Sequence, residues 1–283
     1  MQRFYPILFV FLWSTGFIGA KYGLPYAEPL SFLLTRYCLV IALMTVIALA
    51  TRAPWPKDPK QWLHIGVSGV LVHAVYLGGV FVAIKHGLPA GVTALVVGMQ
   101  PLLTALGAGW LLGEQVSGRQ WGGLVLGFVG VGLVVSGKFG EAALGPMLIP
   151  ALVALLGITA GTLYQKRFCA QFDLRTGSVI QFVPTAILTA LAVALFEEFR
   201  IEWTPDFIFA LGWLVLVLSL GAISLLNLLI RNGSAVNVAS LFYLTPISTA
   251  VIAWAIFGEK LTLTAAAGML LAVSGVYLVG RAK

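Results

Sequence analysis

Long apolar stretches alternate with short polar turns along the whole chain. Ten of these stretches are about 20 residues long, the length that an α-helix needs to cross the hydrocarbon core of a bilayer. Their approximate bounds are 4–23, 29–50, 61–84, 91–112, 119–137, 146–165, 175–196, 206–230, 235–257 and 264–280. The connections between them are no longer than about ten residues, so the pattern predicts an all-α membrane protein with ten transmembrane helices and no soluble domain.

The composition agrees with a lipid environment. Apolar residues make up 60% of the 283 residues, charged residues only 10%, and the mean hydropathy is +0.99. A soluble domain needs about a quarter charged residues to cover its surface, so we expect the lipid bilayer to contact most of this surface. The net charge of +7 comes from residues in short turns rather than on one face, which argues against a nucleic-acid partner.

The lysines and arginines are distributed unevenly between the two ends of the predicted helices. If the N-terminus is cytoplasmic, eleven of the 17 lie in cytoplasmic segments, five lie in outer segments, and Arg36 lies inside the second helix. Because lysine and arginine are enriched in cytoplasmic loops, both termini are predicted to be cytoplasmic.

The second half of the chain repeats the first. A constant offset of 145 residues places Pro101 on Pro246 and the corner 113–114, Gly-Glu, on the corner 258–259. Each half has five predicted helices, an odd number, so the two copies (residues 1–138 and 139–283) must be inverted relative to each other in one transport unit. Secondary transporters use inverted repeats to build two gates around one site near the midplane. A duplicated bundle without transport function is the alternative.

Several residues in these repeats carry a family resemblance. They are Trp13-Ser14 in the first helix, Arg36 within SFLLTRYCL of the second, the segment from Pro101 to Glu114, and its copy from Pro246 to Glu259. On these residues the chain resembles the EamA-like ten-helix exporters of the drug/metabolite transporter superfamily. The resemblance implies a multi-pass protein of the bacterial inner membrane, and it is nearest to bacterial exporters of aromatic amino acids. It leaves open a drug, nucleoside or other metabolite exporter, with proton antiport as one form of coupling.

Prolines near the centres of the fourth and ninth helices mark a candidate site. Proline cannot donate a backbone hydrogen bond and crowds the carbonyl four residues earlier, so Pro101 and Pro246 should leave the carbonyls of Val97 and Phe242 without their usual partners. Such carbonyls must face protein or a water-filled cavity. We therefore expect the two prolines to act as hinges beside a central cavity, although they could serve only to kink the helices into the bundle.

Other residues of the predicted helices could line the same cavity. Aromatic walls with neutral hydrogen-bonding groups suit a small amphipathic solute, such as an amino acid. Helix-to-helix hydrogen bonding or ordinary packing is the alternative role for each side chain. The candidate cavity residues are Trp13, Thr15, His73, Tyr76, Gln100, Thr159, Asn227, Tyr243 and Thr245.

Charge is scarce inside the predicted helices. No Asp or Glu lies at the centre of a helix, and His73 is the titratable group nearest the midplane. This favours export that is downhill or driven by the membrane potential, with proton coupling through His73 as the alternative. Arg36 could snorkel to the surface, bind a helix carbonyl, or bind the carboxylate of a substrate.

Glutamates and glycines near the helix ends are expected to be structural. Residues 117–120, Ser-Gly-Arg-Gln, form a capping-box pattern that opens the fifth helix. Glu114 and Glu259 should bind backbone amides at the start of the helix that follows each. Glycines at 123, 127 and 130, with those at 268 and 275, predict close packing of the fifth and tenth helices, either within the bundle or between subunits. The chain is expected to be a monomer or a weak dimer.

The motifs of enzymes are missing from the sequence. There is no His-Glu-x-x-His, Gly-x-Ser-x-Gly or Cys-x-x-Cys, and only three histidines occur. We therefore predict no catalytic residues, no metal site and no cofactor. A passive channel stays open as an alternative, but it should show a continuous polar stripe rather than two symmetric prolines.

Overall fold

The computed structural model describes residues 4–88, 90–136, 146, 148–169, 171–257 and 262–281. The first half contains α1 (Tyr5–Gly23), the 3₁₀ turn η2 (Leu24–Tyr26), α2 (Pro29–Ala50), α3 (Pro59–Gly69), the π-helix η3 (Val70–Leu77), α4 (Gly78–Lys85), α5 (Ala90–Val97), α6 (Gln100–Leu112) and α7 (Gly118–Val135). The second half contains α8 (Leu148–Phe168), α9 (Leu174–Phe196), α10 (Pro205–Trp213), the π-helix η5 (Leu214–Ala222), α11 (Ile223–Asn232), α12 (Ala235–Ser240), the 3₁₀ turn η6 (Leu241–Tyr243), α13 (Leu244–Phe257) and α14 (Leu263–Arg281).

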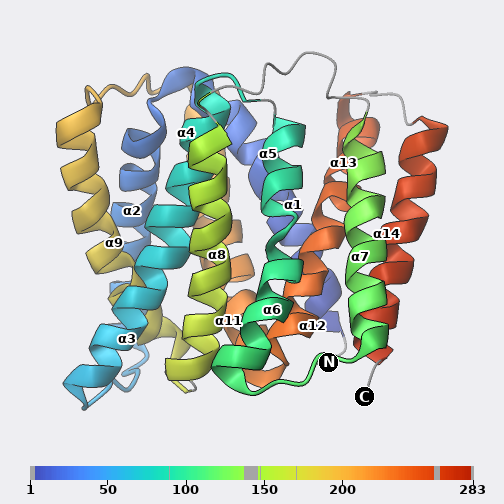
Figure 1. Cartoon of the computed structure of the whole chain (residues 1–283). Coiled ribbons are helices and arrows are strands. Elements are labelled where there is room, and N and C mark those ends of the chain that lie inside the picture. Colours follow the sequence, from blue (N-terminus) through green and yellow to red (C-terminus); the bar gives the residue numbers. More distant parts are fainter. Residues whose placement is uncertain are drawn as a thin grey trace.

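These elements confirm the predicted all-α fold with ten spans. Nine helical stretches of the described residues are long and apolar enough to cross a bilayer, and the apolar helix Tyr5–Gly16 within α1 is a shorter tenth. The stretches α3–η3–α4, α5–α6, α10–η5–α11 and α12–η6–α13 each form one span. Figure 1 shows one bundle in which the start of α1 and the end of α14 lie at the same end, as an even number of crossings requires.

The two halves interlock reciprocally. Helix α1, the first span of the first half, packs on η5 and α13 of the second half. Helix α8, the first span of the second half, packs in the same way on η3 and α6 of the first half. Helices α2 and α9, which correspond under the repeat, pack on each other. This exchange of equivalent contacts is the pattern that a two-fold axis between inverted repeats produces.

Helices α7 and α14 form a close backbone contact (Figure 1). A Cβ atom at Gly130 would lie 2.6 Å from the carbonyl oxygen of Gly268, and a Cβ atom at Gly275 would lie 2.5 Å from that of Gly123. Neither distance admits a side chain, so the glycines let the two backbones touch. The predicted close packing is therefore confirmed, and it lies within the bundle.

Four spans are interrupted near their centres. In the fourth span the α-helix breaks between Val97 and Gln100, just before Pro101. In the ninth span the 3₁₀ turn η6 interrupts the α-helix just before the segment that contains Pro246. Val97 and Phe242 are both buried in protein.

The third and eighth spans contain η3 and η5, which the 145-residue offset superimposes within one residue. The sequence analysis did not predict these π-helices. They occur in proteins mostly as short insertions, frequently at functional sites.

The helix ends show one difference from the sequence prediction. The capping box of Ser117 and Gln120 is present at the start of α7. Because these two side chains already cap α7, Glu114 does not bind the helix that follows it. Its Oε1 instead accepts a hydrogen bond (3.1 Å) from the amide of Ala235, at the start of α12 in the other half. Glu259, the corresponding residue, lies outside the described part of the chain.

Candidate functional site

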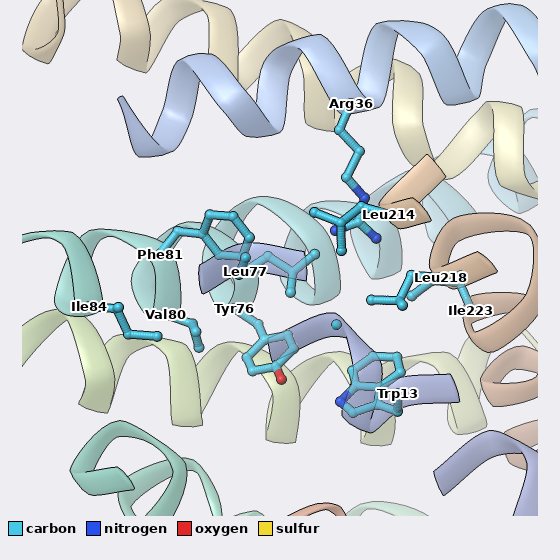
Figure 2. Close-up of a pocket in the computed structure, with 12 residues that line it drawn as sticks. Trp13, Arg36, Tyr76, Leu77, Val80, Phe81, Ile84, Leu214, Leu218 and Ile223 are labelled. Carbon is cyan, nitrogen blue, oxygen red and sulfur yellow. The ribbon is translucent and has the colours of Figure 1, made fainter. Parts of the chain in front are cut away.

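Side chains of the first, second, third and eighth spans enclose a cavity in the bundle (Figure 2). Its volume is about 30 Å³, which holds roughly two water molecules at ~10–15 Å³ each. An amino acid does not fit in this space, so the cavity has to widen to admit a solute. The lining residues are Trp13, Gly16, Ala20, Arg36, Tyr76, Leu77, Val80, Phe81, Ile84, Leu214, Leu218 and Ile223.

Aromatic rings form one wall of the cavity. Trp13 of α1 stacks on Tyr76 of η3, with ring centroids 6.4 Å apart and an interplanar angle of 10°. The same indole meets Phe242 of η6 in a T-shaped arrangement, at a centroid distance of 5.3 Å and an interplanar angle of 87°. The stack thus joins the first span to the irregular segments of the third and ninth spans. A movement of either segment would be transmitted to the aromatic wall.

Arg36 supplies positive charge to the cavity. Its side chain enters from α2 and directs the guanidinium toward Leu214 (Figure 2). The residue is only 1% exposed. Nε donates a hydrogen bond to Ser219 Oγ (3.1 Å), and Ser219 Oγ donates to the carbonyl of Leu214, five residues earlier (3.1 Å). In the part of the chain that the structure describes, no carboxylate pairs with Arg36; the ion pairs found there lie at helix ends.

His73 lies on a different face of η3 from Tyr76. Its ring stacks on Phe182 of α9, with centroids 4.3 Å apart, and its carbonyl accepts a hydrogen bond from Tyr37 Oη (2.9 Å). Neither ring nitrogen has a hydrogen-bond partner within hydrogen-bonding distance among the described residues. The histidine is thus buried between the third and seventh spans and does not line the cavity.

The polar residues beside the two prolines are buried at the helix breaks. Gln100 Nε2 donates to Thr162 Oγ1 of α8 across a long 3.5 Å contact. Gln100 Oε1, Tyr243 Oη and Thr245 Oγ1 lack a hydrogen-bond partner among the described protein atoms. A buried polar group without a partner costs about 1–3 kcal/mol, so these atoms mark places where water or a solute would be stabilised. The ring of Tyr243 packs on Gly127 of α7, away from the enclosed cavity.

Two of the three candidate threonines, Thr15 and Thr159, bond to their own helices. Thr159 Oγ1 donates to the carbonyl of Leu155 at 2.7 Å, and Thr15 Oγ1 donates to that of Leu12 at 2.6 Å. Thr15 also accepts a hydrogen bond from Trp213 Nε1 at 2.9 Å. Thr15 borders a separate apolar crevice of about 340 Å³ between α1, α10 and α13. Neither threonine lines the enclosed cavity.

Asn227 belongs to a chain of buried amide side chains that connects four spans. It accepts a hydrogen bond from Gln165 Nε2 of α8 (2.9 Å) and donates one to Gln181 Oε1 of α9 (3.2 Å). Gln181 Nε2 in turn donates to Ser68 Oγ of α3 (3.1 Å). All four residues are at most 4% exposed. This chain fixes how the spans of the second half meet α3, and it lies outside the cavity lining.

The structure thus brings together only part of the predicted site. Of the nine candidate side chains, Trp13 and Tyr76 line the enclosed cavity, and the other seven are buried at contacts between or within helices. The sequence analysis left the role of Arg36 open and missed the aliphatic wall that includes Leu214 and Leu218. Charge inside an apolar span was the signal that could have placed Arg36 at the site. The two leucines do not differ from their apolar neighbours in the sequence.

Comparisons with known proteins agree with this architecture. The model of the EamA-like transporter family matches twice, over residues 4–136 and 145–281. The chain is 30% identical to the uncharacterized transporter YvbV of Bacillus subtilis over 274 residues, covering 95% of this chain and 88% of YvbV. It is 27% identical to a probable amino-acid metabolite efflux pump of Escherichia coli over 286 residues, covering 96% and 92% of the two chains.

A solved crystal structure shares the fold. It has 21% sequence identity and a TM-score of 0.79, and the superposition covers 97% of this chain and 94% of that chain. The family match spans nearly the whole chain in two copies, one for each half. The chain therefore belongs to the EamA-like transporter family, and it is a multi-pass membrane transporter rather than an enzyme.

Proposed function

We propose that this transporter exports small amphipathic solutes, amino acids among them, by alternating access around the enclosed cavity. The observation that carries the proposal is the set of four interrupted spans, paired by the repeat, next to a cavity with aromatic walls. The relative in Escherichia coli that is named a probable amino-acid metabolite efflux pump supports the solute class.

The interruptions give the two halves places to bend. A helix break before Pro101 removes backbone hydrogen bonds that would otherwise hold the two parts of the fourth span in line. The break before Pro246 does the same in the ninth span. Inverted repeats turn such equivalent breaks into two gates, one for each side of the membrane. In this proposal residues 1–138 and 139–283 rock against each other, and the prolines are hinges.

The cavity also favours a carrier over a passive channel. A channel needs a continuous polar path, whereas the lining residues other than Arg36 and the hydroxyl of Tyr76 are almost all apolar. His73 lies outside the lining, between η3 and α9. This position supports downhill or potential-driven export over proton coupling through the histidine. A drug or other metabolite exporter is the competing assignment, and the solute panel below distinguishes it.

Efflux from proteoliposomes tests the proposal. Purified protein is reconstituted with labelled amino acids, nucleosides and cationic drugs, and efflux is followed with and without a pH gradient. Trp13→Ala and Tyr76→Ala should lower the efflux of amphipathic amino acids at unchanged protein amount. Trp110→Ala is the matched control, because Trp110 is 90% exposed on the outside of the bundle. The proposal would be contradicted if the Trp13 and Tyr76 variants lost no more efflux than the Trp110 control. Efflux that occurs only under a pH gradient would also contradict it.

The residues at the helix breaks are tested in the same assay. Gln100→Ala and Tyr243→Ala should lower efflux, because a solute in the widened cavity would meet the unpartnered polar atoms of these side chains. Unchanged efflux in both variants would remove the two residues from the transport path and leave the enclosed cavity as the site.

A further inference from the structure

We propose that Arg36 binds the carboxylate of the transported solute, and that the site prefers apolar monocarboxylates to zwitterionic amino acids. This inference rests on the proposed function, because it takes the enclosed cavity as the transport site. It ranks the solutes of that class by their charge: one negative group on an apolar body favours binding, and an added ammonium group weakens it.

The surroundings of Arg36 differ from those of the structural cations in this molecule. Arg175 pairs with Asp173 at 2.7 Å, and Lys166 donates to the carbonyls that end α11, at 3.0 Å for Ile230. Asp173 neutralises the charge of Arg175, and the partial negative charge of the carbonyls that end α11 stabilises the ammonium of Lys166. Arg36 is more deeply buried than either, yet the hydrogen bond that the structure gives it goes to a neutral hydroxyl.

The guanidinium keeps donors available for an anion. Arginine has five N–H donors in a planar fork, and the bond to Ser219 uses Nε. Among the residues that the structure describes, no hydrogen bond is found for the four N–H groups of the two Nη atoms, and Figure 2 shows these nitrogens at the cavity beside Leu214. Such a fork matches the two oxygens of a carboxylate, which it can bind with two parallel hydrogen bonds. The bond to Ser219 holds the fork in place for this role.

The rest of the lining fits an apolar body. Trp13, Tyr76 and Leu218 surround the cavity with rings and aliphatic carbons. An aryl or branched aliphatic group would bury its surface there, and its carboxylate would neutralise the buried charge of Arg36. The bound complex would then carry no net charge, and the attraction between the two opposite charges is strongest in a low-dielectric environment.

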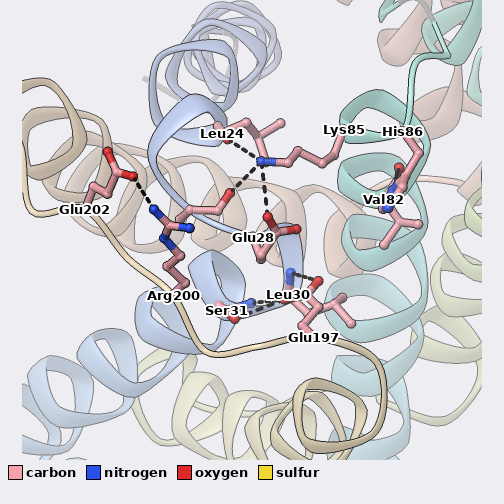
Figure 3. A network of polar contacts seen from close by, with 11 residues as sticks. Leu24, Glu28, Leu30, Ser31, Val82, Lys85, His86, Glu197, Arg200 and Glu202 are labelled. Atoms are coloured by element: carbon pink, nitrogen blue, oxygen red, sulfur yellow. Dashed lines mark hydrogen bonds and ion pairs between the residues drawn. The ribbon is translucent and has the colours of Figure 1, made fainter.

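An amino acid would bring an ammonium group that finds no carboxylate in the cavity lining. Among the described residues, the acidic side chains lie at helix ends, as the pairs of Glu28 with Lys85 and Glu202 with Arg200 illustrate (Figure 3). A ring face of Trp13 or Tyr76 could attract a cation, but one face of each ring is turned to the other ring, and a ring face carries no net charge to neutralise an ammonium group. The ammonium would therefore remain close to another positive charge.

Four ligands with one phenylpropyl skeleton separate the contributions of the carboxylate, the ammonium group and the apolar body to binding. Binding of 3-phenylpropanoate, phenylalanine, 3-phenylpropan-1-ol and 3-phenylpropylamine to wild-type protein in detergent is measured by calorimetry. The acid should bind roughly tenfold or more tightly than the alcohol, because hydrogen bonds to a charged group are the stronger ones. It should also bind more tightly than phenylalanine, and the amine should bind most weakly. This series needs no variant, so it stands even if substitutions of Arg36 prevent folding.

Substitution then assigns the preference to one residue. Arg36→Gln should remove the difference between acid and alcohol, whereas Arg200→Gln, at an exposed arginine on the outer surface, should leave it unchanged. Equal or tighter binding of phenylalanine by wild-type protein would overturn this inference alone and leave the proposed function standing. Binding of none of the four ligands, together with no efflux of any of them from proteoliposomes, would contradict both.

Discussion

Adding one methyl group at either of two equivalent glycines should destabilise the bundle by the same amount. Gly130 of α7 and Gly275 of α14 correspond under the 145-residue offset and lie on opposite sides of the contact between these helices. A Cβ atom would come to 2.6 Å and 2.5 Å from backbone oxygens of the facing helix, respectively. An ordinary contact between a Cβ atom and a backbone atom needs a distance of about 3.4 Å or more. Each alanine should therefore push the two helices apart locally by roughly 0.8 Å.

The energetic cost follows from this displacement. A gap of about 0.5–1 Å already forfeits a quarter to a half of the dispersion energy of the atoms that face it, and overpacking of this kind costs about 1–3 kcal/mol. For a chain of this size, one kcal/mol corresponds to a shift of about 2–4 °C in Tm. Gly130→Ala and Gly275→Ala should therefore each lower Tm by about 2–12 °C.

Thermal unfolding of purified protein in detergent measures these shifts. Gly122→Ala is the matched control, because a Cβ placed there meets nothing within 4 Å beyond its chain neighbours and the adjacent backbone of its own helix, and its Tm should not fall below that of wild type, since alanine is the better helix former. A control-like Tm for both glycine variants would refute the close backbone contact. A large shift for one glycine and none for the other would refute its two-fold symmetry.

Three further predictions concern polar contacts. Glu114→Ala should lower Tm because the amide of Ala235 loses its acceptor, at a cost of about 1 kcal/mol; Glu114→Gln keeps an oxygen there and should not. The Arg175 guanidinium bonded to Asp173 holds the pKa of that carboxyl below its ordinary value. The stability that Asp173 adds is present above the pKa of the unfolded chain and is lost as pH falls through the lower folded-state pKa, so Asp173→Asn should show a flatter Tm profile between about pH 5 and pH 2. Asn227→Ala should destabilise by about 1–3 kcal/mol, and a double-mutant cycle with a neighbouring glutamine should show coupling rather than additivity.

The fold was largely predictable from the sequence because membrane spans leave a strong signal. Runs of apolar residues as long as the bilayer is thick fix the number of spans. The repeated Pro and Gly-Glu positions reveal two copies, and the odd number of spans in each copy requires that they be inverted. The close contact at Gly130 and Gly275 followed from small residues on helices that correspond under the repeat. These features depend on residue type and spacing, which can be read without coordinates.

The site was less predictable because it depends on which face of each helix turns inward. The π-helical turns of η3 and η5 shift the register of the residues that follow them, so an extrapolated 3.6-residue period misplaces faces. His73 and Tyr76 were both predicted to line the cavity, yet the histidine packs on Phe182 while the tyrosine lines the cavity. Polar type alone also could not separate Asn227, which bonds helices together, from a residue that meets solute.

Alternating access requires that the cavity can be reached from each side of the membrane in turn. Leu218 lines the cavity, so Leu218→Cys, in a background with Cys38 and Cys169 replaced by serine, reports which side can reach it. Membrane-impermeant maleimides are applied from one side at a time to oriented vesicles, with and without solute. Alternating access should give labelling from each side, with solute shifting the balance between the two. A cysteine that reacts from one side only, whatever solute is present, would contradict it.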